Sequence, residues 1–118
     1  MTTLAGSSAK SKQDPAPQTT GRNLLIWMDG KLVPEEEARV SVFDHGLLYG
    51  DGVFEGIRVY NGRIFKFGSH LDRLFRSAEK IELTPAFSRE VIEKATRETV
   101  EANGLTDAYI RLVLTRGY

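Results

Sequence analysis

Three arginines stand at positions where a guanidinium could bind an anion. Arg58 and Arg111 each lie in an apolar run that predicts a β-strand, and Arg73 lies near the start of a predicted amphipathic helix. A strand arginine that faces a cleft can hold a carboxylate through two parallel hydrogen bonds, whereas an arginine beside helix N-terminal amides suits a phosphate. Each arginine taken alone is also compatible with a side chain that simply reaches solvent.

The other groups with chemical potential give weaker indications. Tyr49 lies among Gly46, Gly50 and Gly52, so it is either a half-buried core residue or a hydroxyl presented on a shaped loop. His45 and His70 are far apart, and we expect both to be structural, with no metal site. The chain has no cysteine, which excludes disulfides and thiol nucleophiles and fits a reducing, cytoplasmic location.

Length and charge narrow the class of protein. The 118 residues suffice for one domain, and 41% hydrophobic with 27% charged residues is the composition of a soluble protein. Sixteen basic and sixteen acidic residues cancel, so charge gives no reason to expect nucleic acid or an acidic membrane as a partner. No apolar run approaches the roughly 20 residues of a membrane span.

The segment 1–23 differs from the rest of the chain. It consists mainly of small and polar residues, with one large aliphatic, Leu4, and one acid, Asp14. Such a segment cannot bury enough apolar surface to offset the entropy of ordering, so we predict a disordered N-terminal extension followed by one domain over residues 24–118.

Alternation and turn residues predict the strands. Two short runs, 24–28 and 31–33, flank the hairpin pair Asp29-Gly30, and 53–60 and 63–67 flank Asn61-Gly62. Further strands are predicted at 40–43 and 108–115. Within 53–60, one face is mostly apolar and carries Val53, Glu55, Ile57 and Val59. The other face carries Phe54, Gly56, Arg58 and Tyr60, an unusual set for a plain solvent surface.

Two helices follow the second hairpin. The first is predicted to begin at Ser69, with Asp72 completing a capping box, and the second at Ser88, with Gly104 after its end. Apolar residues at helical spacing in the first helix predict that it packs on the sheet. The predicted fold is therefore α+β, a two-layer sandwich of a mostly antiparallel sheet with two helices on one face.

Three ordered motifs resemble the fold-type IV pyridoxal-phosphate enzymes, also called class IV aminotransferases. They are the segment 44–58 (DHGLLYGDGVFEGIR), His70-Leu71-Asp72-Arg73-Leu74, which resembles a His-x-x-Arg-Leu helix start, and Tyr109-Ile110-Arg111. The resemblance runs from about residue 26 to 117. Within the family, Phe54-Glu55-Gly56-Ile57-Arg58 is most similar to the branched-chain amino-acid aminotransferases.

The resemblance implies a cofactor, substrates and roles for particular residues. It implies that Arg73 binds the phosphate of pyridoxal 5'-phosphate and that Arg111 holds a substrate carboxylate. Residues Phe54, Gly56 and Arg58 would line the substrate pocket, and Tyr49 would reach the site of a neighbouring subunit in a homodimer. The implied reaction moves an amino group between a branched-chain amino acid and 2-oxoglutarate.

One part of the family pattern has no counterpart in the chain. The family's cofactor-bonding lysine lies well downstream of the His-x-x-Arg-Leu motif, in a second domain. None of the lysines here matches it: Lys10, Lys12, Lys31, Lys66, Lys80 and Lys94. We therefore expect an N-terminal small domain that has no catalytic residue of its own and is inactive alone. The alternatives are a D-amino-acid aminotransferase or aminodeoxychorismate lyase domain, or an inactive binding module.

Overall fold

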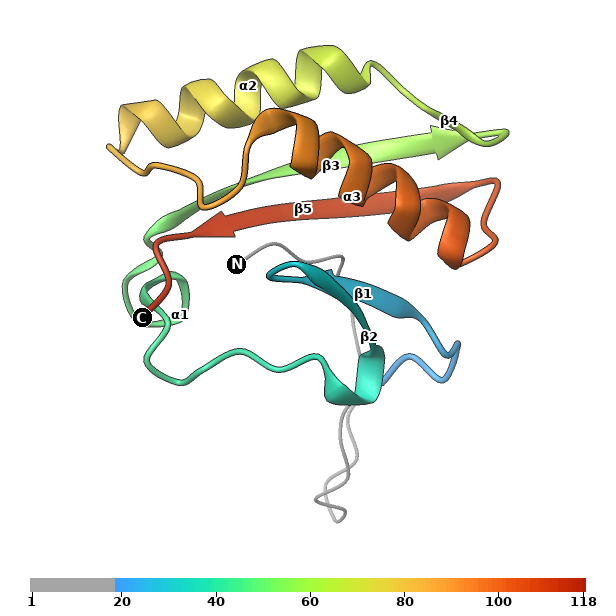
Figure 1. Ribbon diagram of the computed structural model, residues 1–118, viewed down its shortest axis with the longest axis horizontal. Coiled ribbons are helices and arrows are strands. Elements are labelled where there is room, and N and C mark those ends of the chain that lie inside the picture. Colours follow the sequence, from blue (N-terminus) through green and yellow to red (C-terminus); the bar gives the residue numbers. More distant parts are fainter. Residues whose placement is uncertain (1–18) are drawn as a thin grey trace.

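A computed structural model describes residues 19–118 as two small antiparallel sheets with helices between and around them (Figure 1). The elements follow in the order β1 (Leu25–Met28), β2 (Lys31–Pro34), the 3-10 helix η1 (Glu35–Glu37), α1 (His45–Tyr49), β3 (Gly52–Tyr60), β4 (Arg63–Ile64), α2 (Phe67–Lys80), α3 (Arg89–Ala102) and β5 (Ala108–Thr115). The α+β class and the antiparallel pairing predicted from the sequence are confirmed.

The larger sheet has the strand order β4-β3-β5 and is built on the long strand β3. β5 pairs with β3 from Gly52↔Thr115 to Val59↔Ala108, whereas β4 pairs with it only at Val59 and Tyr60. The connecting turn has positive φ at Asn61 (51°) and Gly62 (79°), as a type I′ turn requires. The outer edge of β3 over residues 52–57 has no strand partner within the part of the chain described here.

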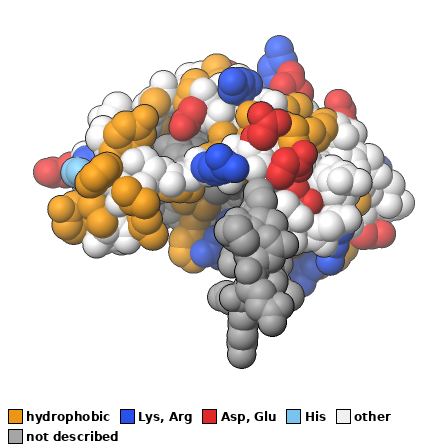
Figure 2. All heavy atoms as spheres, turned by 90° about the horizontal axis from the view of Figure 1, so that it is seen from below, with side chains coloured by type: hydrophobic (Ala, Val, Ile, Leu, Met, Phe, Trp, Pro, Cys, Tyr) orange, Lys and Arg blue, Asp and Glu red, His pale blue; other side chains and the backbone are white. Residues whose placement is uncertain are grey.

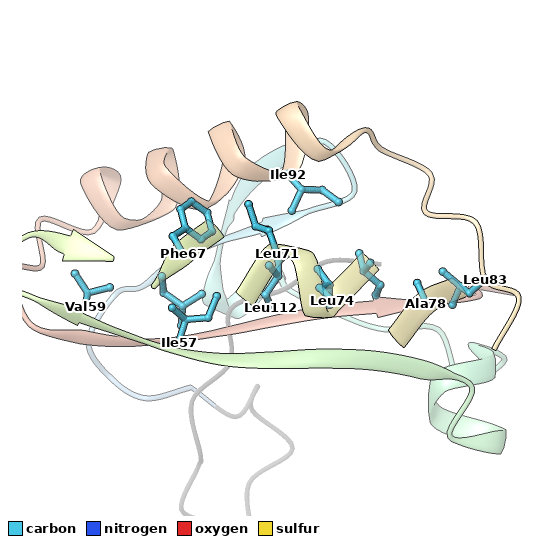
Figure 3. Packing of buried hydrophobic residues seen from close by; sticks show 11 residues of the cluster. Ile57, Val59, Phe67, Leu71, Leu74, Ala78, Leu83, Ile92 and Leu112 are labelled. Carbon is cyan, nitrogen blue, oxygen red and sulfur yellow. The ribbon is translucent and has the colours of Figure 1, made fainter. Parts of the chain in front are cut away.

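Both α2 and α3 cover the same face of this sheet. The core cluster joins Ile57 and Val59 of β3 to Leu71 and Leu74 of α2 and to Ile92 of α3, and all five are almost completely buried (Figure 3). Burial of a side chain of this size contributes roughly 1.5–3 kcal/mol, so this shared face is what holds helices and sheet together. The two-layer arrangement with two helices on one face is confirmed.

The β1–β2 hairpin forms the second sheet and packs against α3 rather than joining β3. The rings of Trp27 and Phe87 meet edge to face at 5.1 Å. Asn103, the C-cap of α3, accepts from the Leu25 amide through its side-chain oxygen and donates to the Leu25 carbonyl. These contacts fasten the hairpin to both ends of α3.

Four local predictions were wrong. Residues 40–43 form no strand, and the predicted returning strand 63–67 ends at Ile64. α2 begins at Phe67 rather than Ser69, after Lys66 in the left-handed conformation, and no side chain caps it. Ser69 therefore lies inside the helix and forms no capping box with Asp72, whose carboxylate pairs with Arg89 at 2.6 Å. The strand cannot continue to residue 67 because Lys66 is in the left-handed region and α2 begins at Phe67.

The second helix is as predicted at both ends. Ser88 caps α3 by accepting from the Val91 amide, and Gly104 follows the helix with a φ of 62°. Most of the predicted extension 1–23 lies outside the described residues. Its last part is described, and Thr20 donates from its amide and hydroxyl to the Glu35 carboxylate, so contacts with the domain begin before residue 24.

Candidate functional site

The face of the larger sheet opposite the helices carries a group of cations stacked on aromatic rings. The Arg111 guanidinium lies 3.6 Å from the centre of the Phe54 ring, and the Arg58 guanidinium lies 5.6 Å from that of Tyr109. All four side chains come from neighbouring positions of β3 and β5. We call Phe54, Gly56, Arg58, Tyr109 and Arg111 the arginine platform.

Strand register brings the platform together. Gly56 pairs with Arg111 and Arg58 pairs with Tyr109, so the side chains of alternate residues on the two strands share one face. The Tyr109 hydroxyl lies over Gly56, where a Cβ atom would overlap it. Glycine at position 56 therefore leaves the space that the hydroxyl end of the Tyr109 ring occupies.

An apolar groove adjoins the platform beside Phe54. It has a volume of about 410 Å³, and its apolar lining includes Val40, Leu47, Val53 and Val113. A flat cationic surface next to an apolar groove can bind a molecule that has a carboxylate at one end and an aliphatic group at the other.

Arg73 lies on the opposite, helix-covered face of the sheet. Its Nε and Nη2 atoms donate to the Glu55 carboxylate at 2.9 and 2.8 Å, and His70 Nδ1 lies 2.6 Å from the same group. The Glu55 side chain is only 5% exposed, while that of Arg73 is 59% exposed. We call Glu55, His70 and Arg73 the carboxylate–arginine cluster.

The electrostatics of this cluster favour the ionised forms of Glu55 and Arg73. Burial would raise the pKa of Glu55, but the hydrogen bonds from Arg73 and His70 outweigh it and hold that pKa below its usual value. The same pairing raises the pKa of Arg73. Glu55 is therefore a carboxylate at neutral pH, and Arg73 is a cation whose position is fixed on one side.

The structure thus brings together some of the predicted site residues and not others. Phe54, Gly56 and Arg58 share one face, as predicted, and strand register adds Arg111 to it, but Arg73 lies across the sheet from them. Arg73 also follows the start of α2 by six residues, so the N-terminal amides of the helix do not join its guanidinium. The edge of β3 over residues 52–57, which has no strand partner within residues 19–118, separates the two faces.

Tyr49 ends the short helix α1, is not one of the residues that form the platform, and is 71% exposed. Asp44 anchors this helix by accepting from the Gly46 amide at 2.8 Å and from the Thr115 hydroxyl at 3.2 Å. Around Tyr49 the chain exposes further large apolar side chains, namely Val42, Phe43, Leu47 and Leu48. Figure 2 shows hydrophobic side chains gathered at the end of the molecule where α1 lies.

Two members of the site carried no role in the sequence-based predictions. Tyr109 was identifiable in principle, because it alternates with Arg111 and so shares its face. Glu55 was also identifiable in principle, because an acid on the otherwise apolar face of β3 needs a buried partner. The identity of that partner, two elements away, could not be inferred from spacing.

Within residues 19–118 there is neither a metal-binding cluster nor a membrane-spanning helix. No group of three or more His, Asp or Glu side chains is placed to hold a metal ion. None of the helices combines the length and apolar character needed to span a bilayer.

The comparisons with known proteins identify the family. The family model for amino-transferase class IV matches residues 52–118, which include β3, the carboxylate–arginine cluster and the whole arginine platform. The chain belongs to this family. Its close relatives are branched-chain aminotransferases, of which it corresponds to a small N-terminal part.

Particular relatives agree with this assignment. A putative branched-chain-amino-acid aminotransferase of Methanocaldococcus jannaschii is 53% identical over 94 residues, which are 80% of this chain and 33% of that protein. The branched-chain-amino-acid aminotransferase of Pseudomonas aeruginosa is 43% identical over 100 residues, covering 81% and 33%. The chain therefore spans about a third of the length of these relatives.

Solved structures show the same fold. The branched-chain aminotransferase of Thermoproteus uzoniensis, determined with norvaline, has a TM-score of 0.72 and 46% identity, with coverage of 78% of this chain and 33% of that one. A T.th. branched-chain amino acid aminotransferase, determined with pyridoxamine 5'-phosphate, has a TM-score of 0.75 and 42% identity, with coverage of 79% and 32%.

Proposed function

We propose that this chain forms the small N-terminal domain of a pyridoxal-phosphate-dependent aminotransferase that moves amino groups between branched-chain amino acids and 2-oxoglutarate. The observation that carries the proposal is the stacking of Arg111 on Phe54 beside the apolar groove. The guanidinium would hold the substrate carboxylate, and the groove would take an aliphatic side chain. Arg58, Gly56 and Tyr109 complete the surface against which the substrate would lie.

The residues present fit the phosphate of the cofactor. Arg73 uses its Nε and Nη2 atoms on Glu55, while its Nη1 has no hydrogen-bond partner within residues 19–118 and the side chain is 59% exposed. A guanidinium held in this way presents its outer nitrogens to a phosphate. When bound, the cofactor supplies the electron sink that the reaction at the substrate α-carbon requires.

The amine that bonds to the cofactor belongs, in this proposal, to polypeptide outside the 118 residues. Lys31, Lys66, Lys80 and Lys94 are all exposed, whereas a cofactor-bonding lysine acts in a site from which water is excluded. The chain alone would then not transaminate. Borohydride reduction of the 118-residue chain with pyridoxal phosphate, followed by peptide mapping, should find no lysine labelled stoichiometrically; one such lysine would contradict this part of the proposal.

The partners follow from the same assignment. The substrates would be a small amino acid and a 2-oxo acid, with no nucleic acid and no membrane involved, in the cytoplasm. The exposed apolar side chains around Tyr49 support a homodimer in which Tyr49 reaches the site of the other subunit.

The decisive test is substrate preference in the full-length protein that carries this chain. We expect transfer from L-leucine, L-isoleucine and L-valine to 2-oxoglutarate, and an Arg111→Ala variant with a KM for L-leucine raised about 100-fold. Activity with D-alanine and none with L-leucine would favour a D-amino-acid aminotransferase. Absence of cofactor binding would favour a binding module.

A further inference from the structure

Glu55 is a buried carboxylate whose role in the proposed function is not explained by substrate or cofactor contact. It lies on the core-facing side of β3, on the same face as Ile57, and only 5% of its side chain is exposed. A buried carboxylate must be fully hydrogen-bonded to be tolerated. A methyl or methylene group would serve packing better at this position, so the acid calls for another reason.

The geometry of the contact between Arg73 and Glu55 gives a reason for an acid at this position. Nε and Nη2 form one side of the planar guanidinium, and both donate to Glu55, at 2.9 Å to Oε2 and 2.8 Å to Oε1. Two parallel bonds fix the plane of the group as well as its position. The remaining end, formed by Nη1 and the second hydrogen of Nη2, then points away from the carboxylate on a side chain that is 59% exposed.

His70 supports the carboxylate from a second direction. Its Nδ1 lies 2.6 Å from Oε1 of Glu55, the oxygen that also accepts from Arg73. Because Glu55 is ionised, Nδ1 carries the hydrogen and donates it. His70 and Arg73 are three residues apart on α2 and so share one side of the helix, from which both reach the same strand residue.

We propose that Glu55 is a positioning residue for the cofactor phosphate, acting only through Arg73, whose outer guanidinium end it aims at the phosphate. This inference rests on the proposed function, in which Arg73 binds that phosphate. The pair is electrically neutral, so the site depends on the direction of the Arg73 donors and not on excess positive charge.

For the variant Glu55→Gln, the positioning role and an effect of charge alone predict opposite changes in phosphate binding. Glu55→Gln removes a negative charge next to Arg73, so an effect of charge alone would tighten phosphate binding. The glutamine amide, however, presents N–H donors to the N–H donors of Arg73, and the parallel pair of bonds is lost. We therefore expect weaker phosphate binding in a site that has become more positive.

The experiment compares pyridoxal 5'-phosphate with pyridoxal, which lacks the phosphate, in the full-length protein. The dissociation constant of pyridoxal divided by that of the phosphate ester isolates the phosphate contribution. We expect Arg73→Ala to lower this ratio about 100-fold and Glu55→Gln about tenfold, and the double variant to match Arg73→Ala alone. Asp72→Asn is the matched control, because it breaks a neighbouring acid–arginine pair, Asp72 with Arg89, and should leave the ratio unchanged.

Each of the other possible results contradicts either the positioning role of Glu55 or the role of Arg73 as phosphate ligand. An unchanged or increased ratio in Glu55→Gln, or a further loss when it is added to Arg73→Ala, overturns the positioning role while leaving Arg73 as the phosphate ligand. An unchanged ratio in Arg73→Ala overturns both. If Glu55→Gln does not fold, Glu55→Asp keeps the charge but shortens the side chain, and an undiminished ratio there also rejects the proposal.

Discussion

Arg111 and Arg73 are held by chemically different neighbours, and this difference determines what each can bind. Arg111 lies on the face of an aromatic ring, which orients its plane but takes up none of its N–H donors. Arg73 donates from one side of its guanidinium, Nε and Nη2, to the Glu55 carboxylate, and the other side makes no such contact. At the residue scale, Arg111 therefore keeps all its N–H donors for the carboxylate of the proposed substrate. Arg73 keeps only the end of its guanidinium that faces away from Glu55.

Replacement of Arg111 by lysine tests the importance of the stacked plane. Arg111→Lys keeps the positive charge but loses both the planar fork and the flat contact with Phe54. We expect the KM for L-leucine in the full-length protein to rise about tenfold, measured by steady-state kinetics. Arg97→Lys is the control, because Arg97 lies 5.1 Å from the Phe67 ring outside the platform; an equal effect there would contradict the assignment.

A second residue-scale prediction concerns the absence of a side chain at position 56. Gly56→Ala would drive a Cβ into the Tyr109 hydroxyl, so the ring must move or the strands must separate. We expect a loss of about 1–3 kcal/mol in the free energy of unfolding, measured with urea. Gly68→Ala, in α2 where a Cβ meets open space, should instead stabilise by about 0.5 kcal/mol. Equal effects at the two sites would show that Tyr109 does not occupy the Gly56 position.

At the element scale, Arg116 ties together three segments that are distant in sequence. It donates to Asp51 after α1 at 2.6 Å, and to the Ile81 and Glu82 carbonyls beyond the end of α2 at 2.8 and 3.1 Å. The carbonyls at a helix C-terminus lack partners in the helix, and a cation is favourable there. The end of β5, the end of α2 and the start of β3 are thereby fixed relative to one another.

Loss of the Arg116 hydrogen bonds should lower the Tm by an amount that depends on pH. The hydrogen bonds from Arg116 hold the pKa of Asp51 below its usual value, so their contribution is present above about pH 4 and is lost as the pH falls through the lowered folded-state pKa. We expect Arg116→Ala to have a lower Tm than the unaltered chain at pH 7, with a smaller difference near pH ~3. Lys94→Ala, which breaks only a 3.9 Å surface pair with Glu98, should change the Tm little at either pH. A difference that does not vary with pH would contradict the role of Asp51.

The elements themselves could be predicted wherever local rules decide. The Asn61-Gly62 turn, the Ser88 cap and the alternation of β3 all follow from short-range chemistry, and each is confirmed. The start of α2 could not be predicted in this way, because Lys66 enters the left-handed region without a capping side chain. Ser69 has the better capping side chain, but the helix begins two residues earlier, at the buried Phe67.

The candidate site was predictable in its composition but not in its arrangement. Alternation placed Phe54, Gly56 and Arg58 on one face, and the resemblance added Arg111 and Arg73. The position of Arg73 across the sheet depends on Glu55, and a contact between residues 18 apart in sequence is decided by packing of α2 on β3. The periodicity of apolar residues predicts each helix or strand separately and does not predict contacts between side chains of different elements.

At the scale of the whole molecule, the main feature is the apolar surface around α1. Phe43 and Leu47 are more than 60% exposed, an unusual concentration for a chain with balanced charge. If this surface forms the contact of the proposed homodimer, Leu47→Asp in the full-length protein should shift the sedimentation velocity profile from dimer to monomer at a fixed concentration. Val91→Asp, at an exposed apolar residue of α3, is the control and should not dissociate it. Dissociation by both variants, or by neither, would exclude this surface as the specific contact.

The alternation of β3 also constrains how this chain can change over evolutionary time. Phe54 and Glu55 are consecutive, yet one belongs to the proposed substrate surface and the other anchors the proposed phosphate ligand from the opposite side. Insertion or deletion of a single residue before them would exchange the two sides, and both binding functions would be lost in one step. Length variation should therefore accumulate at the Asn61-Gly62 turn, while the strand between Gly52 and Arg58 keeps a constant number of residues.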